Sequence, residues 1–452
     1  MKSKLLLFSL AISISCFSQD SVFQLKDFKY RTPGFKALSL DLSLSGHTTR
    51  SQIVPGYDDV SSNFNLAPAQ LEFTKIISTD KRLHQATITL LPWVSLAKAK
   101  TPSMETSTNQ VQSSLRWDRN DRLYKNGLWF LEIGNLFDAS ISSLKQKEIT
   151  RQTTSNELSL QNTFSVGFGK GRVERVQDAQ MALFILNDLQ AQGLLNTKVT
   201  PTLANDFAKL ITDINNKRVF DARRRRIYEL TRVDSFLQNS GLVERTNIRH
   251  FTTVNDNWAF AINPFRLSGT AWFARLKPGI GYFRNHHEEQ FIPNPSIQNK
   301  SDNFLLSLTP EVGIENYVPV SLKWQRNTRL SLAYNGYRSK YSFKNVYPGG
   351  TTESETTVYS WDAKLTGFLG YGYFPNNRTQ IGGNFLAEAL YYKDRSWALS
   401  PQVDLFANYF IGYRTYLTAE VFFKYNYAHV LQNDNEHVLN AGFNLQFSHF
   451  IF

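Results

Sequence analysis

The sequence has little cysteine, little glycine and no long apolar run. A single Cys and 24 Gly among 452 residues exclude a disulfide framework, a cysteine-ligated zinc protein and a collagen-like repeat. Beyond the N-terminal segment no run of roughly 18 apolar residues occurs, so no transmembrane helix is expected. Charged residues make up only 19 %, whereas Phe, Tyr and Trp make up 14 %. Because so many aromatic side chains need burial or an apolar surrounding, the composition disfavours a disordered chain.

Residues 1–19 are typical of an export signal peptide. Two lysines precede a short apolar core over 5–17, and the polar Asp20 follows. The apolar core is shorter than the roughly 20 residues that span a bilayer. A lipoprotein signal acylated at Cys16 is the alternative, although the residues before Cys16 fit a lipobox poorly. Export makes nucleic acid an unexpected partner, despite the formal net charge of +12.

Most of the chain alternates between apolar and polar residues with a period of two, the pattern of strands with one apolar face. Many of the alternating runs last roughly 10–17 residues, which exceeds the 5–6 residues of ordinary globular strands. A tilted transmembrane strand needs about 9–11 residues, so these runs are long enough to cross a membrane. The last run illustrates the pattern, with Leu439, Ala441, Phe443, Leu445 and Phe447 alternating with residues that include Asn440, Asn444 and Gln446.

The spacers between the runs alternate in length. Short spacers lie near 80–81, 120–121, 318–319, 375–377 and 412–414, and long polar spacers lie near 46–63, 98–109, 146–156, 285–302 and 344–356. Short turns at one rim and long loops at the other are typical of outer-membrane barrels. The runs number 14, or 16 if residues 246–264 form one more hairpin with its turn at 254–257.

Residues 170–245 break the alternation and show helical spacing over 178–192, 201–214 and 217–239. The sequence predicts a three-helix insertion, acting either as a periplasmic cap or as a plug in the lumen. The third helix carries a run of four arginines: Arg223, Arg224, Arg225 and Arg226. This run is a candidate surface for an anion or an envelope protein partner. The alternative is ordinary i,i+4 pairing with acidic residues of the same helix.

The signal peptide, the aromatic-rich alternating strands, the alternating spacers and the terminal Phe452 together resemble Gram-negative outer-membrane β barrels of a Bacteroidota-like kind. The resemblance covers 20–169 and 246–452. It implies an all-β transmembrane antiparallel barrel of 14–16 strands in the outer membrane, in contact with its lipid. It also implies that the barrel-assembly machinery reads the last strand, with Phe450 and Phe452 as the candidate signal. Polar residues occupy the preceding matching positions, so either a bulge near 448–450 or a degenerate form of the signal is expected.

In hydrocarbon each unpaired backbone N–H or C=O costs several kcal/mol, so spanning strands must close on themselves. Charges near the middle of a strand are then expected to face the lumen. The candidate lumen residues are Lys323, Arg329, Lys364, Lys424, Asn440, Asn444 and Gln446. The basic members of this set would bias a pore toward anions.

Catalytic and metal-binding motifs are sparse. The dense cluster over 286–289, His-His-Glu-Glu, falls in an expected outer loop, and no metal or cofactor is expected. No Gly-x-Ser-x-Gly elbow occurs, which leaves a barrel hydrolase as a minor alternative. The expected function is porin-like passage of small polar solutes, narrowed by the helical insertion. The alternative is an accessory barrel without transport activity, within an envelope complex for secretion, assembly or surface display.

Overall fold

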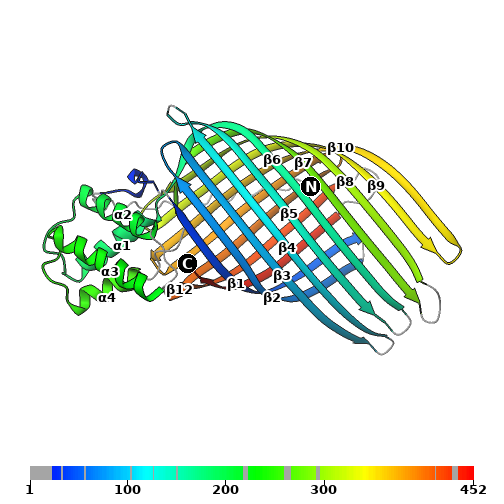
Figure 1. Ribbon diagram of the computed structural model, residues 1–452, viewed down its shortest axis with the longest axis horizontal. Helices are drawn as coiled ribbons and strands as arrows, with labels where there is room; N and C mark the ends of the chain where they lie inside the picture. Colours follow the sequence, from blue (N-terminus) through cyan, green and yellow to red (C-terminus); the bar gives the residue numbers. More distant parts are fainter. Residues whose placement is uncertain are drawn as a thin grey trace, which may run out of the picture.

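The alternating segments form a closed barrel of 14 antiparallel strands in the computed structural model (Figure 1). The structure describes residues 23–31, 34–54, 57–101, 104–125, 127–148, 151–216, 222–258, 266–291, 296–412, 414–429 and 436–451. Each strand pairs with its neighbours in the chain, and β1 closes the barrel against β14. The export signal and Phe452 lie outside the described residues.

The strands and helices have the following bounds. The first half contains β1 (Phe35–Val54), β2 (Tyr57–Ser78), β3 (Arg82–Thr101), β4 (Met104–Tyr124), β5 (Trp129–Lys147) and β6 (Arg151–Arg175). The helices are η1 (Leu25–Asp27), α1 (Gln177–Ala191), α2 (Pro201–Asn216), α3 (Ala222–Asn239) and α4 (Ile248–Trp258). The second half contains β7 (Leu267–Phe291), β8 (Ser296–Pro319), β9 (Trp324–Tyr347), β10 (Gly350–Asn376), β11 (Thr379–Tyr392), β12 (Trp397–Gly412), β13 (Thr415–His429) and β14 (Glu436–Phe450).

The lower strand count, 14, is correct, and the hairpin predicted over 246–264 is wrong. Residues 248–258 form helix α4, and 259–265 lie outside the described residues. His250, Val254 and Trp258 recur at helical spacing and are buried on one face of α4. The side chain of Asn247 accepts a hydrogen bond from the backbone N–H of His250 at 2.9 Å, which caps the start of the helix. The insertion therefore contains four α-helices in its described part rather than three.

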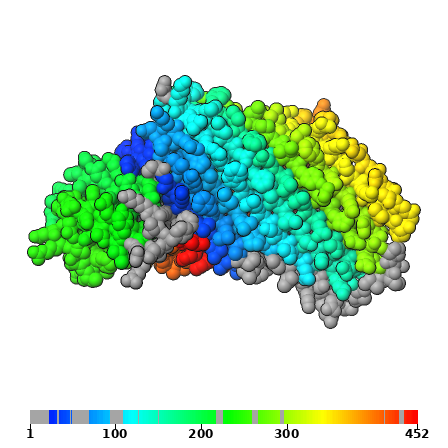
Figure 2. Space-filling view, viewed as in Figure 1, coloured from blue at the N-terminus to red at the C-terminus, as the bar shows by residue number. Residues whose placement is uncertain are grey.

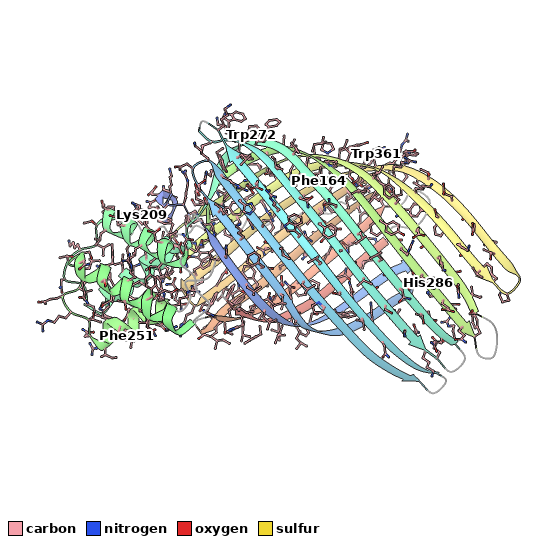
Figure 3. All side chains as sticks on the ribbon, viewed as in Figure 1. Phe164, Lys209, Phe251, Trp272, His286 and Trp361 are labelled. Carbon is pink, nitrogen blue, oxygen red and sulfur yellow. The ribbon has the colours of Figure 1, made fainter. Side chains whose placement is uncertain are left out.

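The long polar spacers are mostly strand. The spacer predicted over 285–302, for example, contains the end of β7 and the start of β8, with only 292–295 outside the described residues. The cluster over 286–289 therefore lies in strand β7 and not in a loop. Figure 3 labels His286, the first residue of this cluster. The short spacer predicted at 120–121 is also wrong, because β4 continues to Tyr124. Polar residues on both faces allow these hairpins to continue into water as paired strands.

The wall is less fully paired between β2 and β3 than elsewhere. Within the described strands, β2 and β3 are paired only from the pair Leu71 and Leu90 to the pair Ser78 and Leu83. By contrast, β3 and β4 are paired along the whole length of β3. Pro68 in β2 and Pro92 in β3 lie just beyond the last pair. Because proline has no N–H to donate, the two prolines favour separation of the strands at this point.

The four α-helices form a bundle, here called the cap, beyond the end of the barrel where the short turns lie (Figures 1 and 2). The prediction of a plug inside the lumen is therefore wrong, and the position is that of a cap. Its core contains fully buried apolar side chains, among them Phe207, Ile185 and Leu237. Leu25 and Phe28 of the N-terminal segment pack into the same core. No described helix is long and apolar enough to cross a membrane.

The last strand contains no bulge. Its pairing with β1 and with β13 runs without a register shift from Glu436 to Phe450. Phe447 and Leu445 face outward and are 39 % and 48 % exposed, whereas Phe450 faces inward and is buried with Phe35 and Ile76. The bulge predicted near 448–450 is wrong because Phe450 has an apolar place inside the barrel and needs no change of register.

Candidate functional site

The two faces of the barrel wall differ sharply in polarity. The outer face exposes large apolar side chains at alternate positions, for example Phe164, Val166 and Phe168, each more than half exposed (Figure 3). Trp129 and Trp272 meet edge-to-face on the outer surface near the cap, with ring centroids 5.4 Å apart. An apolar surface that runs around a closed barrel is suited to hydrocarbon, with tryptophans near its border. The inner face is the candidate functional site.

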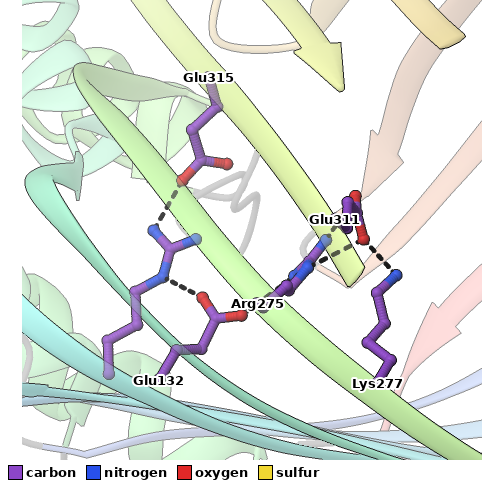
Figure 4. Close-up of polar contacts among 6 residues, drawn as sticks. Glu132, Arg275, Lys277, Glu311 and Glu315 are labelled. Atoms are coloured by element: carbon purple, nitrogen blue, oxygen red, sulfur yellow. Dashed lines mark hydrogen bonds and ion pairs between the residues drawn. The ribbon is translucent and has the colours of Figure 1, made fainter. Parts of the chain in front are cut away.

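One side of the lumen carries a network of charged residues, here called the lumen network (Figure 4). Its members come from β4, β5, β7 and β8: Arg122, Glu132, Arg275, Lys277, Glu311 and Glu315. Three cations and three carboxylates give the network a formal charge of zero. The network is therefore neutralised within itself and presents alternating charge to the lumen.

Glu132 is the centre of the lumen network and is fully buried. Its carboxylate accepts one hydrogen bond from Arg122 Nε and one from an Arg275 terminal nitrogen, each at 3.0 Å. Arg122 also donates to Glu315 at 2.6 Å. Arg275 also donates to Glu311, at 3.0 and 3.1 Å. Each arginine thus bridges two carboxylates, an arrangement that offsets the cost of burying the charges.

Glycine at position 167 makes the contact across β6 possible. In the register, Gly167 lies directly between Glu132 on β5 and Arg275 on β7. A Cβ atom at this position would lie 2.6 Å from Arg275 Cβ and 2.5 Å from a backbone carbonyl oxygen. The absence of a side chain on β6 therefore leaves room for Arg275 to reach Glu132.

The other side of the lumen carries acidic residues, namely Asp41 on β1, Glu72 on β2, Asp404 on β12 and Glu420 on β13. The register places all four on the inward face. Within the described part of the chain, none of the four forms an ion pair. The lumen therefore contains acidic groups that no basic side chain neutralises.

The predicted lumen residues lie as follows. Asn440, Asn444 and Gln446 share the inward face of β14, and Lys424 pairs in register with Asn440. Lys364 forms an ion pair with Glu388, and the Arg329 guanidinium lies 5.0 Å from the Phe368 ring centroid. Lys323 lies in the turn between β8 and β9, so its placement in the lumen wall was wrong. The pattern of the sequence could not identify the lumen network, because its contacts join strands far apart in the chain.

Side chains narrow the lumen at the cap end. Phe35, Ile76 and Phe450 form one cluster with Tyr416, and Tyr124, Phe130, Ala271 and Phe273 form another. Arg172 adds to the second cluster, with its guanidinium 4.4 Å from the Tyr124 ring centroid. It donates to Ser78 Oγ at 3.0 Å and to the Thr79 carbonyl at 2.7 Å. The mouth beside the cap is therefore narrower than a bare 14-strand ring would be.

The cap is attached to the barrel at several points around the rim. Arg266, between α4 and β7, donates to the carbonyl oxygens of Ser321 and Trp324 in and beside the β8–β9 turn, at 2.7 and 2.9 Å. The β10–β11 turn contacts α4, where Asn377 donates to Asn257 at 2.9 Å and Arg378 pairs with Asp256. The N-terminal segment adds two contacts, since Tyr30 Oη donates to Asp213 of α2 at 2.8 Å and Arg31 Nε donates to Glu174 of β6 at 3.3 Å. These attachments at β6, at the β8–β9 turn and at the β10–β11 turn hold the cap at the mouth of the barrel (Figure 1).

The arginines of the run in α3 have different surroundings. Arg225 is 2 % exposed and donates to Glu229 at 2.5 Å, and Glu229 also accepts from Trp258 Nε1 at 2.9 Å. Arg225 is therefore not part of a binding surface. Arg226 donates to Asn255 of α4 at 2.5 Å. The side chains of Arg223 and Arg224 lie outside the described part.

The α3–α4 hairpin does expose an apolar and basic surface. Ile248 is 74 % exposed, Ile227 59 % and Phe251 46 %, and Figure 3 shows Phe251 on the outside of the cap. Arg232, Arg245 and Arg249 are exposed on the same two helices and the segment between them. Exposed branched apolar side chains beside arginines are typical of surfaces that bind another protein.

The cap is expected to lose stability as the pH falls. His250 is 1 % exposed, and its Nδ1 lies 3.8 Å from an Asp234 carboxylate oxygen. Burial lowers the pKa of His250, and the nearby Asp234 only partly opposes this effect. The unfolded chain therefore binds more protons than the folded cap near the ordinary pKa of about 6.5. The free energy of unfolding contributed by neutral His250 is present above that pH and decreases below it.

Hydrogen exchange in α4 of the full-length protein measures this effect. Protection of the α4 amides should be lower at pH 5.5 than at pH 7.5 by more than the intrinsic exchange rates predict. A His250→Gln variant should lack this additional loss. Equal protection at both pH values in the unmodified protein would contradict the assignment.

The two histidines of the 286–289 cluster do not face one another. In the described residues, no group of three His, Cys, Asp or Glu side chains is arranged to hold a metal ion. His286 and His287 are adjacent in β7 and so lie on opposite faces. His287 Nε2 lies 3.4 Å from Glu289, which is a contact within one strand.

No family model and no curated protein matches this chain. Solved outer-membrane barrels resemble it at low identity. The toluene transporter TodX of Pseudomonas putida is 9 % identical, over 92 % of this chain and 89 % of TodX, with a TM-score of 0.38. The NalP autotransporter translocator domain of Neisseria meningitidis is 8 % identical, over 91 % and 88 %, with a TM-score of 0.32. The ferric yersiniabactin receptor FyuA of Yersinia pestis is 5 % identical, over 93 % and 80 %, with a TM-score of 0.36.

Proposed function

We propose that this protein is an outer-membrane channel for small polar solutes, with its inner mouth narrowed by the cap. The observation that carries the proposal is the pairing of an apolar outer face with a polar and charged lumen in a closed 14-strand barrel. A barrel of this size leaves room for water unless a domain fills it. The four described helices of the cap lie outside the lumen, so they do not fill the space between the walls (Figure 1).

The lumen charges favour cations over anions. Lys364 is neutralised by Glu388 and the lumen network is neutral as a whole. Asp41, Glu72, Asp404 and Glu420 have no ion pair within the described residues, and these four acids outnumber Lys424 and Arg329, the two predicted lumen cations that also have none. Acidic rings in a pore attract cations and repel anions. We therefore propose cation preference, in place of the anion preference that a count of lumen lysines and arginines predicts.

Reconstitution of the full-length protein into planar bilayers tests this function. We expect stepwise conductance and, in a KCl gradient, a reversal potential of the sign that K⁺ selectivity produces. The Asp404→Asn/Glu420→Gln variant should move the reversal potential toward zero, because two lumen charges are removed. A Glu353→Gln variant, changed in an exposed hairpin, is the control. No conductance from correctly folded protein would rule out the channel, and anion selectivity would rule out the proposed preference.

A second candidate function is that of an accessory barrel in an envelope complex. The exposed apolar and arginine side chains of the α3–α4 hairpin favour it, because a simple channel has no need of them. In-cell photocrosslinking separates the two functions. A crosslinker at Phe251 should capture a specific partner, whereas one at Lys209 on α2 should not. Capture of only a second copy of this chain, or of nothing, would count against the accessory function.

A further inference from the structure

A second group of polar residues lies where the barrel closes, between its first and last strands. On the inward face, Asp41 of β1 is directly opposite Ser448 of β14, and Ser39 of β1 is directly opposite Glu72 of β2. Gln446 is the next inward residue of β14. These five residues bring together two carboxylates, two hydroxyls and one amide, all capable of offering oxygen atoms.

Asp41 is buried without adequate hydrogen bonding. The residue is 6 % exposed, and the flanking Ser39 and Ser448 are 7 % and 0 % exposed. Asp41 Oδ1 has no hydrogen-bond partner, whereas the other carboxylate oxygen accepts from Ser39 Oγ at 3.5 Å, and Ser448 and Gln446 also direct donors toward the carboxylate. Gln446 Nε2 donates one of its two protons to Ser448 Oγ at 3.1 Å, and the amide oxygen of Gln446 is available as a ligand. A buried carboxylate oxygen therefore points into a group of oxygen donors with nothing bound to it.

No basic side chain balances the two carboxylates. Within the described residues, neither Asp41 nor Glu72 forms an ion pair. The lysines of these strands, Lys36 and Lys75, are paired in register on the opposite, outward face of the wall. The guanidinium of Arg175, at the cap end, lies 4.5 Å from the Phe35 ring centroid and forms no ion pair with either carboxylate. A buried carboxylate beside a half-buried one, without a counter-charge, is disfavoured.

We propose that Asp41 and Glu72, together with Ser39, Ser448 and Gln446, bind a hard divalent cation of the Ca²⁺ type. Oxygen-only donors in an irregular arrangement suit Ca²⁺, which accepts six to eight oxygen ligands with flexible geometry, better than Mg²⁺. Glu72 is half-buried, so its carboxylate is accessible from the lumen, whereas Asp41 is the buried carboxylate of the site. The cation joins β1 and β2 to β14, and so stabilises the seam at which the barrel closes.

Terbium luminescence and thermal unfolding of the full-length protein in detergent test the site. Tyr416 packs against Phe450, which is paired in register with Ser39, so it is placed to sensitise bound Tb³⁺. We expect one sensitised Tb³⁺ per chain, displaced by Ca²⁺, and a higher unfolding temperature in Ca²⁺ than in chelator. Asp41→Asn, which preserves the side-chain shape, and Glu72→Gln should each weaken binding by at least about tenfold. They should also remove the effect of Ca²⁺ on unfolding.

The Glu157→Gln variant, which removes a carboxylate from β6, is the matched control and should bind as the unmodified protein does. Absence of sensitised Tb³⁺ from the folded protein would overturn the proposal. So would unchanged binding in both Asp41→Asn and Glu72→Gln. A third contrary result concerns stability. The unfolding temperature of the unmodified protein would be the same with and without Ca²⁺, and the Asp41→Asn variant would bind no Tb³⁺ and yet unfold at a higher temperature. That result would mean that Asp41 is simply protonated.

Discussion

Replacement of Glu132 by alanine is expected to destabilise the barrel by about 3–5 kcal/mol, because it leaves buried charges without a partner. Glu132 is fully buried and accepts hydrogen bonds from both Arg122 and Arg275. Its removal leaves each guanidinium with only one carboxylate, Glu315 for Arg122 and Glu311 for Arg275. Urea unfolding of the reconstituted barrel, followed by its heat-modifiable mobility, measures the change.

Two further variants show whether the effect depends on buried charge. Glu353→Ala removes an exposed carboxylate paired with Lys344 at 2.7 Å, and should cost less than about 1 kcal/mol. Replacement of Glu132, Arg122, Arg275 and Glu315 together by apolar residues of similar size should recover much of the lost stability. Glu311 keeps its ion pair with Lys277 in this variant, so none of the network charges is left unpaired. If Glu132→Ala unfolds at the same urea concentration as the unmodified protein, the lumen network contributes nothing to stability.

The strands could be predicted because lipid and lumen impose opposite requirements on the two faces of each one. Residues such as Leu417, Val421 and Phe447 are apolar because they face outward, and that requirement is visible locally in the sequence. The lumen network was not predicted, because Arg122 and Glu315 lie far apart in the chain. Only strand order and register bring such residues together. Mid-strand charges at inward positions of β4, β5, β7 and β8 were the available signal.

The error at 246–264 has a local cause. The residues Val254-Asn255-Asp256-Asn257 have the composition of a turn, and turn composition was given more weight than helical spacing. The decisive signals were Asn247 as a helix cap and the recurrence of His250, Val254 and Trp258. In a segment of this length the sequence fits both the strand period of two residues and the helical period of about 3.6 residues. Packing against the other helices decides between strand and helix.

The sign of the lumen charge was not predictable from a count of basic residues. Lys364 and Arg329 do face inward, but Glu388 neutralises Lys364, and the charge of Arg329 is outweighed by the four lumen carboxylates that have no ion pair within the described residues. Asp41 was unremarkable in the sequence because it continues the alternation of β1, with leucines on either side. Its burial against Ser448 depends on contact between the first and last strands. Closure of the barrel is therefore the information that the sequence pattern does not contain.

Removal of the cap is expected to raise the single-channel conductance by about twofold or more, because a structure across the mouth adds resistance in series with the lumen. The design follows from the register, in which Arg175 of β6 pairs directly with Leu267 of β7. A two-residue Asn-Gly turn can therefore replace 176–266 and join the two strands as a tight hairpin. Conductance of this variant in planar bilayers is compared with that of the full-length protein.

A milder variant shows whether a change in conductance comes from the cap at the mouth or from damage to the barrel by the large deletion. Arg378→Ala removes the ion pair between the β10–β11 turn and Asp256 of α4 while leaving every strand intact. It should give an intermediate conductance or more frequent transitions between levels, because one attachment of the cap is lost. Both variants should retain the ion selectivity of the full-length channel, since the lumen carboxylates are unchanged. An unaltered conductance after removal of the cap would show that the aromatic clusters around Phe130 and Phe450, and not the cap, limit passage.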